Sequence, residues 1–190
     1  MTAHELKLSE YLELRKSQHR YRKRRITCGP QCVECIVDGK STISFCSNDY
    51  LGFANHPILK ESAKRAIDDY GVGMGAAHLV NGHSEAHNAL EEELAEFTGY
   101  PRALLFSTGY MANIGICQAL LDRGSYAYED RLNHASLIDA GLLSQARFQR
   151  YQHNDMDSLQ LHLGKADWKA NKMILSDAVF SSVWLMIPCS

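Results

Sequence analysis

Apolar and polar positions change their period along this chain, and the change marks where helices and strands are expected. Between residues 102 and 176, short apolar runs alternate with longer segments of helical periodicity. The pattern predicts strands separated by helices, which is typical of right-handed crossovers and a mainly parallel sheet in an α/β fold. The expected strands are 102–106, 126–129, 148–151 and 172–176, and the expected helices are 110–121, 135–143 and 156–163.

Two helices are expected before residue 71. Residues 4–20 have the apolar spacing of an amphipathic helix. Pro57 is typical of a first helical turn and predicts a second helix that ends near Tyr70. Residues 71–75 are too rich in glycine for a helix or a strand and predict a close-packed loop. The apolar members of the first helix are Leu6, Leu8, Tyr11, Leu12 and Leu14.

A β-hairpin is expected between these two helices. Asp38 and Gly39 form a two-residue turn signal between strand-like runs at 32–37 and 42–45. A polar loop at 47–52 follows the hairpin.

A further helix begins near Ser84 and ends at Gly99, a residue typical of helix C-termini. The glutamates at 91–93 are expected to lie outside its apolar stripe. That stripe consists of Ala86, Leu90, Leu94 and Phe97.

Composition and charge describe an ordinary globular chain. It has 190 residues, 45% hydrophobic and 22% charged residues, and a net charge of −2. This balance gives no global reason for nucleic-acid binding, and the one basic run, at 20–25, is a weak candidate for it. No apolar stretch has the length of a membrane span, and the first twenty residues are charged, unlike a signal peptide. A cytoplasmic location is therefore expected.

The cysteines favour reduced thiols over a metal site. Cys32 and Cys35 form a single C-x-x-C pair, with no second Cys or His pair at the spacing of a zinc site. In an extended strand, their odd offset places the two side chains on opposite faces. No metal is therefore expected.

Polar or small segments follow each strand of the alternating region, at 108–110, 130–134, 153–155 and 177–181. Ligands of open parallel sheets bind beyond the carboxyl ends of the strands, so these four segments could line one pocket. The first segment joins a strand to a helix through Thr108 and Gly109, which is how α/β proteins expose backbone N–H groups to a phosphate. The alternative is that Asn133, Asn154 and Asp155 only cap helices.

Five motifs stand out along the chain, at 47–52, 78–84, 87–94, 107–113 and 133–136. Together they resemble the α-oxoamine synthases, which are pyridoxal-phosphate (PLP) enzymes of the aspartate-aminotransferase fold. The resemblance covers residues from about 10 to 181, and it is closest to the alanine-using branch of biotin biosynthesis. It implies a PLP-dependent transferase of fold type I, with the mainly parallel sheet of the large domain preceded by a helix and a hairpin.

The resemblance also implies roles for individual residues. Gly109 and Tyr110 resemble the residues that bind the phosphate of pyridoxal 5′-phosphate. His134 resembles the catalytic histidine that stacks on the pyridoxal ring and also contacts the substrate. Ser181 resembles the serine near the 3-hydroxyl of the cofactor. For an isolated histidine at the start of a helix, a role as a cap is the alternative.

Two substrate contacts are implied before the sheet. Arg22 resembles an arginine that meets the acyl substrate, although Arg20 or Arg24 could be the true match or the run could be a solvated surface. Asn48 resembles an asparagine near the substrate carboxylate, although an Asx turn would also explain it. The implied reaction is the decarboxylative condensation of L-alanine with pimeloyl-CoA or pimeloyl-acyl carrier protein, in a homodimer with no nucleic-acid or membrane partner.

The resemblance divides the chain into an N-terminal helix and hairpin at 1–46, the first part of the PLP-binding large domain at 47–181, and an aberrant tail at 182–190. The lysine that anchors the cofactor in the family belongs to a later segment, so a truncated chain without synthase turnover is expected. Two alternatives stay open: a related glycine-using acyltransferase, and a non-catalytic remnant.

Overall fold

The computed structural model describes residues 3–180, and side chains from residue 7 onward. By its contacts the chain divides into two compact units, Met1–Gly82 and His83–Ser190. The domain boundary expected at residue 46 stays a prediction, and the tail expected at 182–190 lies outside the described residues.

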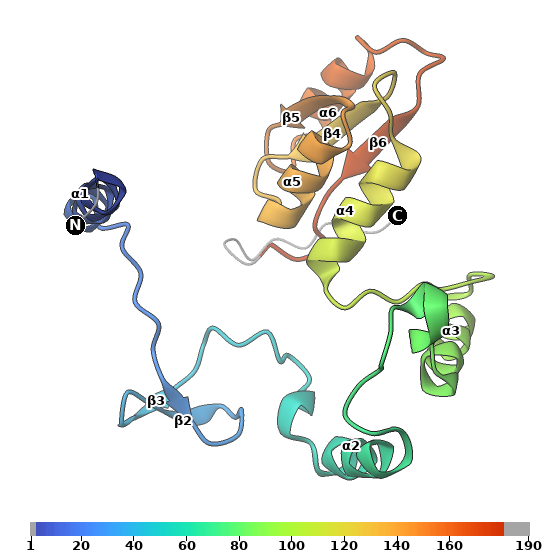
Figure 1. The fold of residues 1–190 in the computed structure, drawn as a ribbon. Coiled ribbons are helices and arrows are strands. Elements are labelled where there is room, and N and C mark those ends of the chain that lie inside the picture. The colour runs from blue at the N-terminus through green and yellow to red at the C-terminus, as the bar shows by residue number, and fades with distance from the viewer. Residues whose placement is uncertain (1–2, 181–190) are drawn as a thin grey trace. The chain divides into compact units, whose positions relative to one another are not determined.

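The first unit begins with helix α1 (Ala3–Ser17), followed by a small antiparallel sheet (Figure 1). The helix is confirmed, but its apolar side chains at Leu8, Tyr11 and Leu14 are half exposed or more within this unit. In the sheet, β2 (Glu34–Val37) pairs with β3 (Lys40–Ile43) and with a short strand that the sequence did not predict, β1 (Thr27–Cys28).

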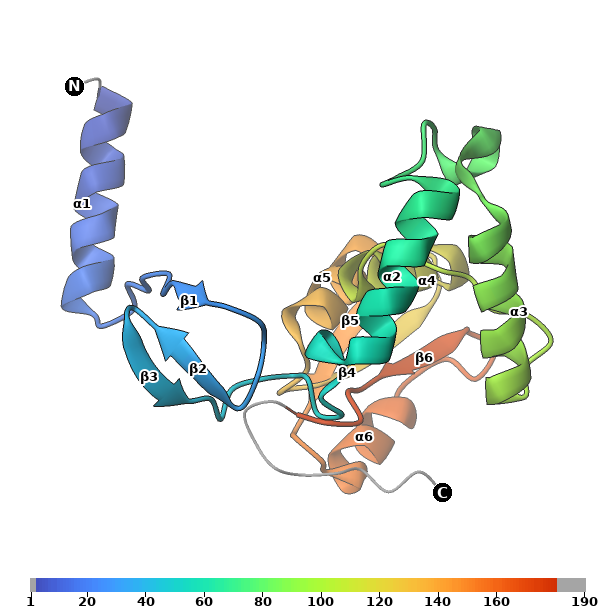
Figure 2. The ribbon, with the colours of Figure 1, turned by 90° about the horizontal axis from the view of Figure 1, so that it is seen from below.

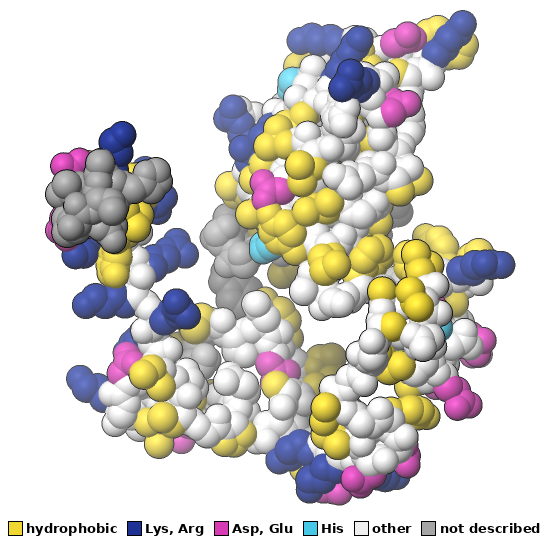
Figure 3. Space-filling view, viewed as in Figure 1, with side chains coloured by type: hydrophobic (Ala, Val, Ile, Leu, Met, Phe, Trp, Pro, Cys, Tyr) yellow, Lys and Arg dark blue, Asp and Glu magenta, His cyan; other side chains and the backbone are white. Residues whose placement is uncertain are grey.

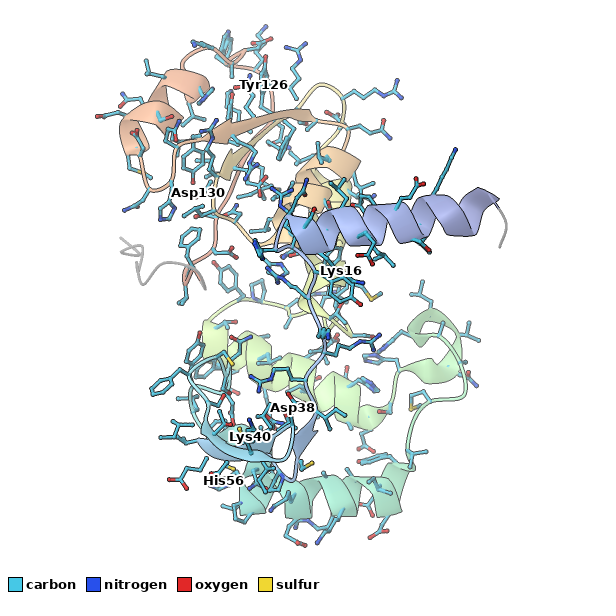
Figure 4. All side chains as sticks on the ribbon, turned by 90° about the vertical axis from the view of Figure 1, so that its left-hand side faces the viewer. Lys16, Asp38, Lys40, His56, Tyr126 and Asp130 are labelled. Carbon is cyan, nitrogen blue, oxygen red and sulfur yellow. The ribbon has the colours of Figure 1, made fainter. Side chains whose placement is uncertain are left out.

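The turn of the hairpin is confirmed at the two expected residues. Asp38 and Gly39 both have positive φ, 51° and 76°, which matches the type I′ turn that suits a two-residue hairpin. The carboxylate of Asp38, which is labelled in Figure 4, also accepts hydrogen bonds from Arg25 Nε at 2.8 Å and Ile26 N at 2.9 Å. These bonds link the residues just before β1 to the hairpin turn. Cys32 precedes β2 instead of lying in it, so the expected strand start was two residues too early.

Helical segments joined by loops make up the rest of this unit. A short 3₁₀ helix, η1 (Phe53–Asn55), precedes α2 (Pro57–Tyr70), whose bounds agree with the prediction. The loop at 71–75 is present but is not close-packed, because a Cβ atom added at Gly71, Gly73 or Gly75 would meet nothing within 4 Å. A π-helical segment, η2 (His78–Gly82), ends the unit, and there a Cβ on Gly82 would lie 1.8 Å from the carbonyl oxygen of Ala76.

The second unit begins with α3 (Glu85–Thr98). Ser84 and His87 form a capping box at its start, and Gly99 ends it in the left-handed conformation at φ 72°. The helix is confirmed, but its expected apolar stripe is wrong in part. Phe97 is 87% exposed and Leu90 is 45% exposed, whereas Ala95 is buried and Glu91 is only 19% exposed.

Three parallel strands form the sheet of this unit, in the order β5-β4-β6. They are β4 (Tyr126–Asp130), β5 (Arg147–Tyr151) and β6 (Lys172–Leu175). Helices α4 (Gly109–Leu120) and α5 (Ala135–Leu143) lie on one face, and α6 (Met156–Leu163) lies on the other (Figure 2). This arrangement confirms the expected parallel sheet and its crossover helices.

Each face of the central strand β4 buries a different set of side chains. Ala127 packs with Cys117, Leu137, Ala140 and other residues of α4 and α5. On the opposite face, Tyr126 and Tyr128 pack with Tyr151 and with Leu159 of α6. The alternation follows the two-residue period of a strand and makes β4 the centre of the core.

The strand expected at 102–106 is wrong, because these residues belong to no sheet among the described residues. A strand needs a neighbour to complete its hydrogen bonds, and the described residues supply none for this segment. Its Leu105 N–H donates instead to the side chain of Glu91.

Several apolar side chains of the second unit are exposed in this chain. Ile116 and Leu120 of α4 and Leu142 of α5 are 46% to 58% exposed, and Figure 3 shows hydrophobic side chains gathered over these helices. In the part of the chain that the structure describes, no helix combines the length and apolarity that crossing a membrane requires.

Candidate functional site

The first element of the candidate site is the amino terminus of α4. Thr108 caps the helix, and its Oγ1 accepts a hydrogen bond from Met111 N at 3.1 Å. Among residues 3–180, the backbone N–H groups of Gly109 and Tyr110 have no hydrogen-bond acceptor, and a Cβ at Gly109 would meet nothing within 4 Å. Two free donors beside open space, at the positive end of a helix dipole, suit an anionic group.

The second element is the amino terminus of α5, where His134 is the cap. Its Nδ1 accepts from Ser136 N at 3.2 Å and lies 2.7 Å from Ser136 Oγ. The same Ser136 Oγ accepts from Asn113 Nδ2 of α4 at 2.9 Å. His134 is therefore linked to Asn113 of α4 through the hydroxyl of Ser136. Its imidazole is exposed. The Tyr110 hydroxyl also donates to the carboxylate of Asp139 on α5, which is a second link between the two helices.

The carboxyl ends of β4 and β6 are joined by side chains. Asn133 Nδ2 donates to Leu175 O at 2.8 Å, and Asp177 N donates to Asn133 Oδ1 at 3.1 Å. The Asp177 carboxylate then accepts from His134 N at 2.7 Å. Asn133 therefore joins two strands and does not cap α5, and Asp177 fixes the backbone that carries the His134 side chain.

The ends of β4 and β5 are joined by Asp130, which is fully buried. Its carboxylate accepts from Leu132 N at 2.8 Å and Asn154 N at 2.9 Å, and it lies 2.9 Å from His153 Nδ1. Burial raises the pKa of Asp130, but these hydrogen bonds outweigh it and hold the pKa below its ordinary value. His153 also packs its ring against the edge of Phe180, with centroids 4.6 Å apart.

Glu129, which the sequence analysis did not single out, carries the most perturbed carboxyl group of this edge. Its side chain is fully buried, and neither carboxylate oxygen has a hydrogen-bond partner among the described residues. Burial raises its pKa to about 7, partly offset by the positive charge of Arg150. A charged residue inside the strand, directly after Tyr128, was the available signal.

The remaining predicted residues do not belong to the described part of the second unit. Arg22 and Asn48 belong to the first unit, and both are exposed. Ser181 lies outside the described residues. A hollow of about 660 Å³ in the second unit lies at the opposite end of the sheet from the candidate site, and is lined by Asp122, Gly124 and Ser144 among others. The three strand-end segments at 130–134, 153–155 and 177 are brought together as expected, and α4 adjoins them through Asn113 and Ser136.

Over the residues that the structure describes, the fold is that of the large domain of fold type I transferases. A serine palmitoyltransferase from Sphingomonas wittichii superposes with a TM-score of 0.84 at 29% identity, over 94% of this chain and 45% of that chain. A high-resolution structure of SPT with PLP superposes with a TM-score of 0.84 at 28% identity, over 95% and 46%. The 8-amino-7-oxononanoate synthase of Francisella tularensis gives 0.62 at 32% identity, over 75% and 38%.

The particular family follows from the sequence match. The family model of class I and II aminotransferases matches residues 40–182, and the chain belongs to that family. The chain is 57% identical to the 8-amino-7-oxononanoate synthase of Methylococcus capsulatus over 87% of its own length and 43% of the relative's. It is 55% identical to that of Cellvibrio japonicus over 92% and 44%. The chain thus spans under half the length of these curated relatives.

Proposed function

We propose that this chain supplies part of an 8-amino-7-oxononanoate synthase, which condenses L-alanine with a pimeloyl thioester and releases carbon dioxide. The observation that carries the proposal is its identity of 51% to 57% with proteins of that name over about nine-tenths of its length. The related structures of serine palmitoyltransferase support a shared PLP-dependent chemistry at lower identity. A glycine-using acyltransferase has no observation that favours it over this assignment.

The residues at the amino terminus of α4 fit the phosphate of pyridoxal 5′-phosphate. The free N–H groups of Gly109 and Tyr110 are suitable donors, and Thr108 fixes the turn that presents them. His134, on the adjoining helix α5, offers an imidazole face to the pyridine ring. When bound, the cofactor supplies an electron sink for the negative charge that develops at the substrate α-carbon.

The contribution of this chain is to hold these groups in place. Asp177 fixes the backbone N–H of His134, and Ser136 fixes its Nδ1, so both the position and the rotation of the imidazole are determined before a ligand arrives. A ring held in this way pays little ordering entropy on binding. The Ser136 hydrogen bond also leaves Nε2 of His134 as the ring nitrogen available to a substrate.

We also propose substrate contacts for two residues of the first unit, Arg22 and Asn48. Arg22 lines an open hollow of about 600 Å³ together with Arg15 and Arg20, and the local positive charge suits a carboxylate such as that of a pimeloyl chain. Asn48 would bind the carboxylate of alanine, and Ser181 the 3-hydroxyl of the cofactor. A homodimer in the cytoplasm is part of the same proposal, as is coenzyme A or acyl carrier protein as the carrier.

The test is a titration of the ¹⁵N-labelled chain with pyridoxal 5′-phosphate, using pyridoxal without the phosphate as the matched ligand. We expect amide shifts at Gly109, Tyr110 and Met111 with the phosphate ester only, and shifts at His134 with both ligands. Replacing His134 by alanine should remove the shifts around α5 and leave those of α4. Absence of any shift at α4 with pyridoxal 5′-phosphate would contradict the proposal.

A further inference from the structure

The buried side of α3 carries an unexpected carboxylate, that of Glu91. Its Oε1 accepts a hydrogen bond from Leu105 N at 2.9 Å, across fourteen residues of sequence. Its Oε2 lies 3.9 Å from Nε2 of His83, and its side chain is only 19% exposed. The neighbouring Glu92 is exposed, and its one side-chain hydrogen bond among the described residues is with Asn88 of its own helix, at 2.9 Å. Glu91 is therefore distinguished from Glu92 by a long-range contact.

The backbone N–H of Leu105 needs the acceptor that the Glu91 carboxylate supplies. Residues 102–106 have no strand partner in the described part of the chain, and Leu105 is partly buried. A buried backbone N–H without an acceptor is costly, by about 1–3 kcal/mol in general, so a side chain that supplies one fixes the local backbone.

A second contact fixes the next residue. The ring of Phe106 lies over α4 at Gly115, where an added Cβ would approach the ring to 3.2 Å. Leu105 and Phe106 are thus held by α3 and α4 respectively. The chain then passes through Ser107 to the Thr108 cap, where the free N–H groups of the candidate site begin.

We propose that Glu91 is a positioning residue for the anion-binding turn 107–109, which it holds through the Leu105 backbone. Glu91 does not touch the ligand. It sets the place of the segment that leads into α4, so that the N–H groups of Gly109 and Tyr110 meet a phosphate without rearrangement. The inference rests on the proposed function, because it assigns to that site a residue from a helix outside it.

The direct test needs no substitution. Measurement of a coupling across the hydrogen bond, between Leu105 N and the Glu91 carboxylate carbon, should detect the contact in the unaltered chain. Slow amide exchange at Leu105 should accompany it. A fast-exchanging Leu105 amide without the coupling would overturn the inference.

The substitution test uses three variants of one helix. Glu91→Ala should speed exchange of the Leu105 amide about fivefold or more and weaken pyridoxal 5′-phosphate binding about 3- to 10-fold, as expected for one lost hydrogen bond. Glu91→Gln keeps an acceptor oxygen and should stay within about twofold of the unaltered chain. Glu92→Ala, the matched control, should change neither quantity.

The two ligands separate positioning from general stability. Glu91→Ala should weaken pyridoxal 5′-phosphate and leave pyridoxal binding unchanged, since only the ester uses the turn 107–109. Equal weakening of both ligands, or unchanged affinity for the ester, would overturn the inference. If the unaltered chain shows no shift at Gly109 with the ester, the proposed function fails, whereas Leu105 exchange in Glu91→Ala still reports separately on the Glu91 contact.

Discussion

At the scale of single residues, the carboxyl group of Glu129 couples the stability of the second unit to pH. Burial raises its pKa from an ordinary value of 4.5 to about 7. Below pH 4.5 the group is protonated in both the folded and the unfolded chain. Between 4.5 and about 7 the unfolded chain releases this proton while the folded chain retains it, so the free energy of unfolding falls as pH rises. The fall is complete above the folded pKa and is at most about 3 kcal/mol.

Replacing Glu129 by glutamine should therefore remove this decrease in the free energy of unfolding with rising pH. We expect Glu129→Gln to raise the free energy of unfolding at pH 8 by about 1–3 kcal/mol, and to change it little at pH 4.5. Urea unfolding at both values, followed by the near-ultraviolet circular dichroism of the buried tyrosines, measures the difference. Glu93→Gln, at an exposed position, is the control. An equal effect of Glu129→Gln at the two pH values would contradict the assignment of the raised pKa.

The contribution of Asp130 to the free energy of unfolding depends on pH with the opposite sign. Its hydrogen bonds hold its pKa below the ordinary value of 3.8, so its contribution is present above that value and is lost as pH falls through the folded pKa. Asp130→Asn replaces one acceptor oxygen by an NH₂ group facing donors, and should lower the free energy of unfolding at pH 7 by about 2–4 kcal/mol. Urea unfolding measures the loss, with Asp157→Asn in the exposed first turn of α6 as the control. A loss no larger than the control's would show that the Asp130 contacts do not hold the strand ends.

At the scale of elements, the amino terminus of α4 depends on one side chain. Thr108→Ala removes the acceptor for Met111 N and should lower the free energy of unfolding by about 1 kcal/mol. Thr108→Ser keeps the hydroxyl and should lose less than half of that. Thermal unfolding followed by circular dichroism compares the two variants. Similar losses in both would mean that the Thr108 methyl group, and not its hydroxyl, stabilises the helix start.

Sequence periodicity predicted most elements and misjudged which face of α3 is buried. The helices α2, α5 and α6 and the parallel sheet were predicted closely, because caps, turn residues and apolar periods are local signals. In α3, Glu91 precedes Leu94 by three residues, so it lies next to the expected apolar stripe on the helix surface. A polar side chain can face inward when a distant group pairs with it, and Leu105 N is that group.

The site residues named from the sequence stay predictions. The glycine turn and His134 belong to local motifs, and this is why the sequence could propose them. The bonds that hold His134 in place join residues 42 to 44 positions apart, through Asn133 and Asp177, and no local pattern reveals such pairings. Glu129 was missed for a related reason: its full burial depends on α4, α5 and both neighbouring strands. The strand at 102–106 was wrong because an apolar run indicates burial but not the presence of a pairing partner.

At the scale of the whole molecule, burial is distributed very unevenly between the two units. Among residues 7–82, Gly82 is the one buried residue, whereas all five residues of β4 are buried in the second unit. Most of the free energy that protects amides from exchange comes from buried apolar contacts, so the two units should differ strongly in protection.

Hydrogen exchange followed by mass spectrometry tests this difference. We expect peptides that contain 126–130 to exchange slowest, and peptides of α1, the hairpin and α2 to exchange at least about 100-fold faster, which corresponds to roughly 3 kcal/mol in opening free energy. The substitution Ala127→Gly enlarges the space beneath α4 and α5 and should accelerate exchange throughout β4, β5 and β6 while leaving α2 unchanged, because the described residues of the Ala127 cluster belong to its own unit. Acceleration of α2 exchange by the same substitution would show that the two units unfold as one cooperative body.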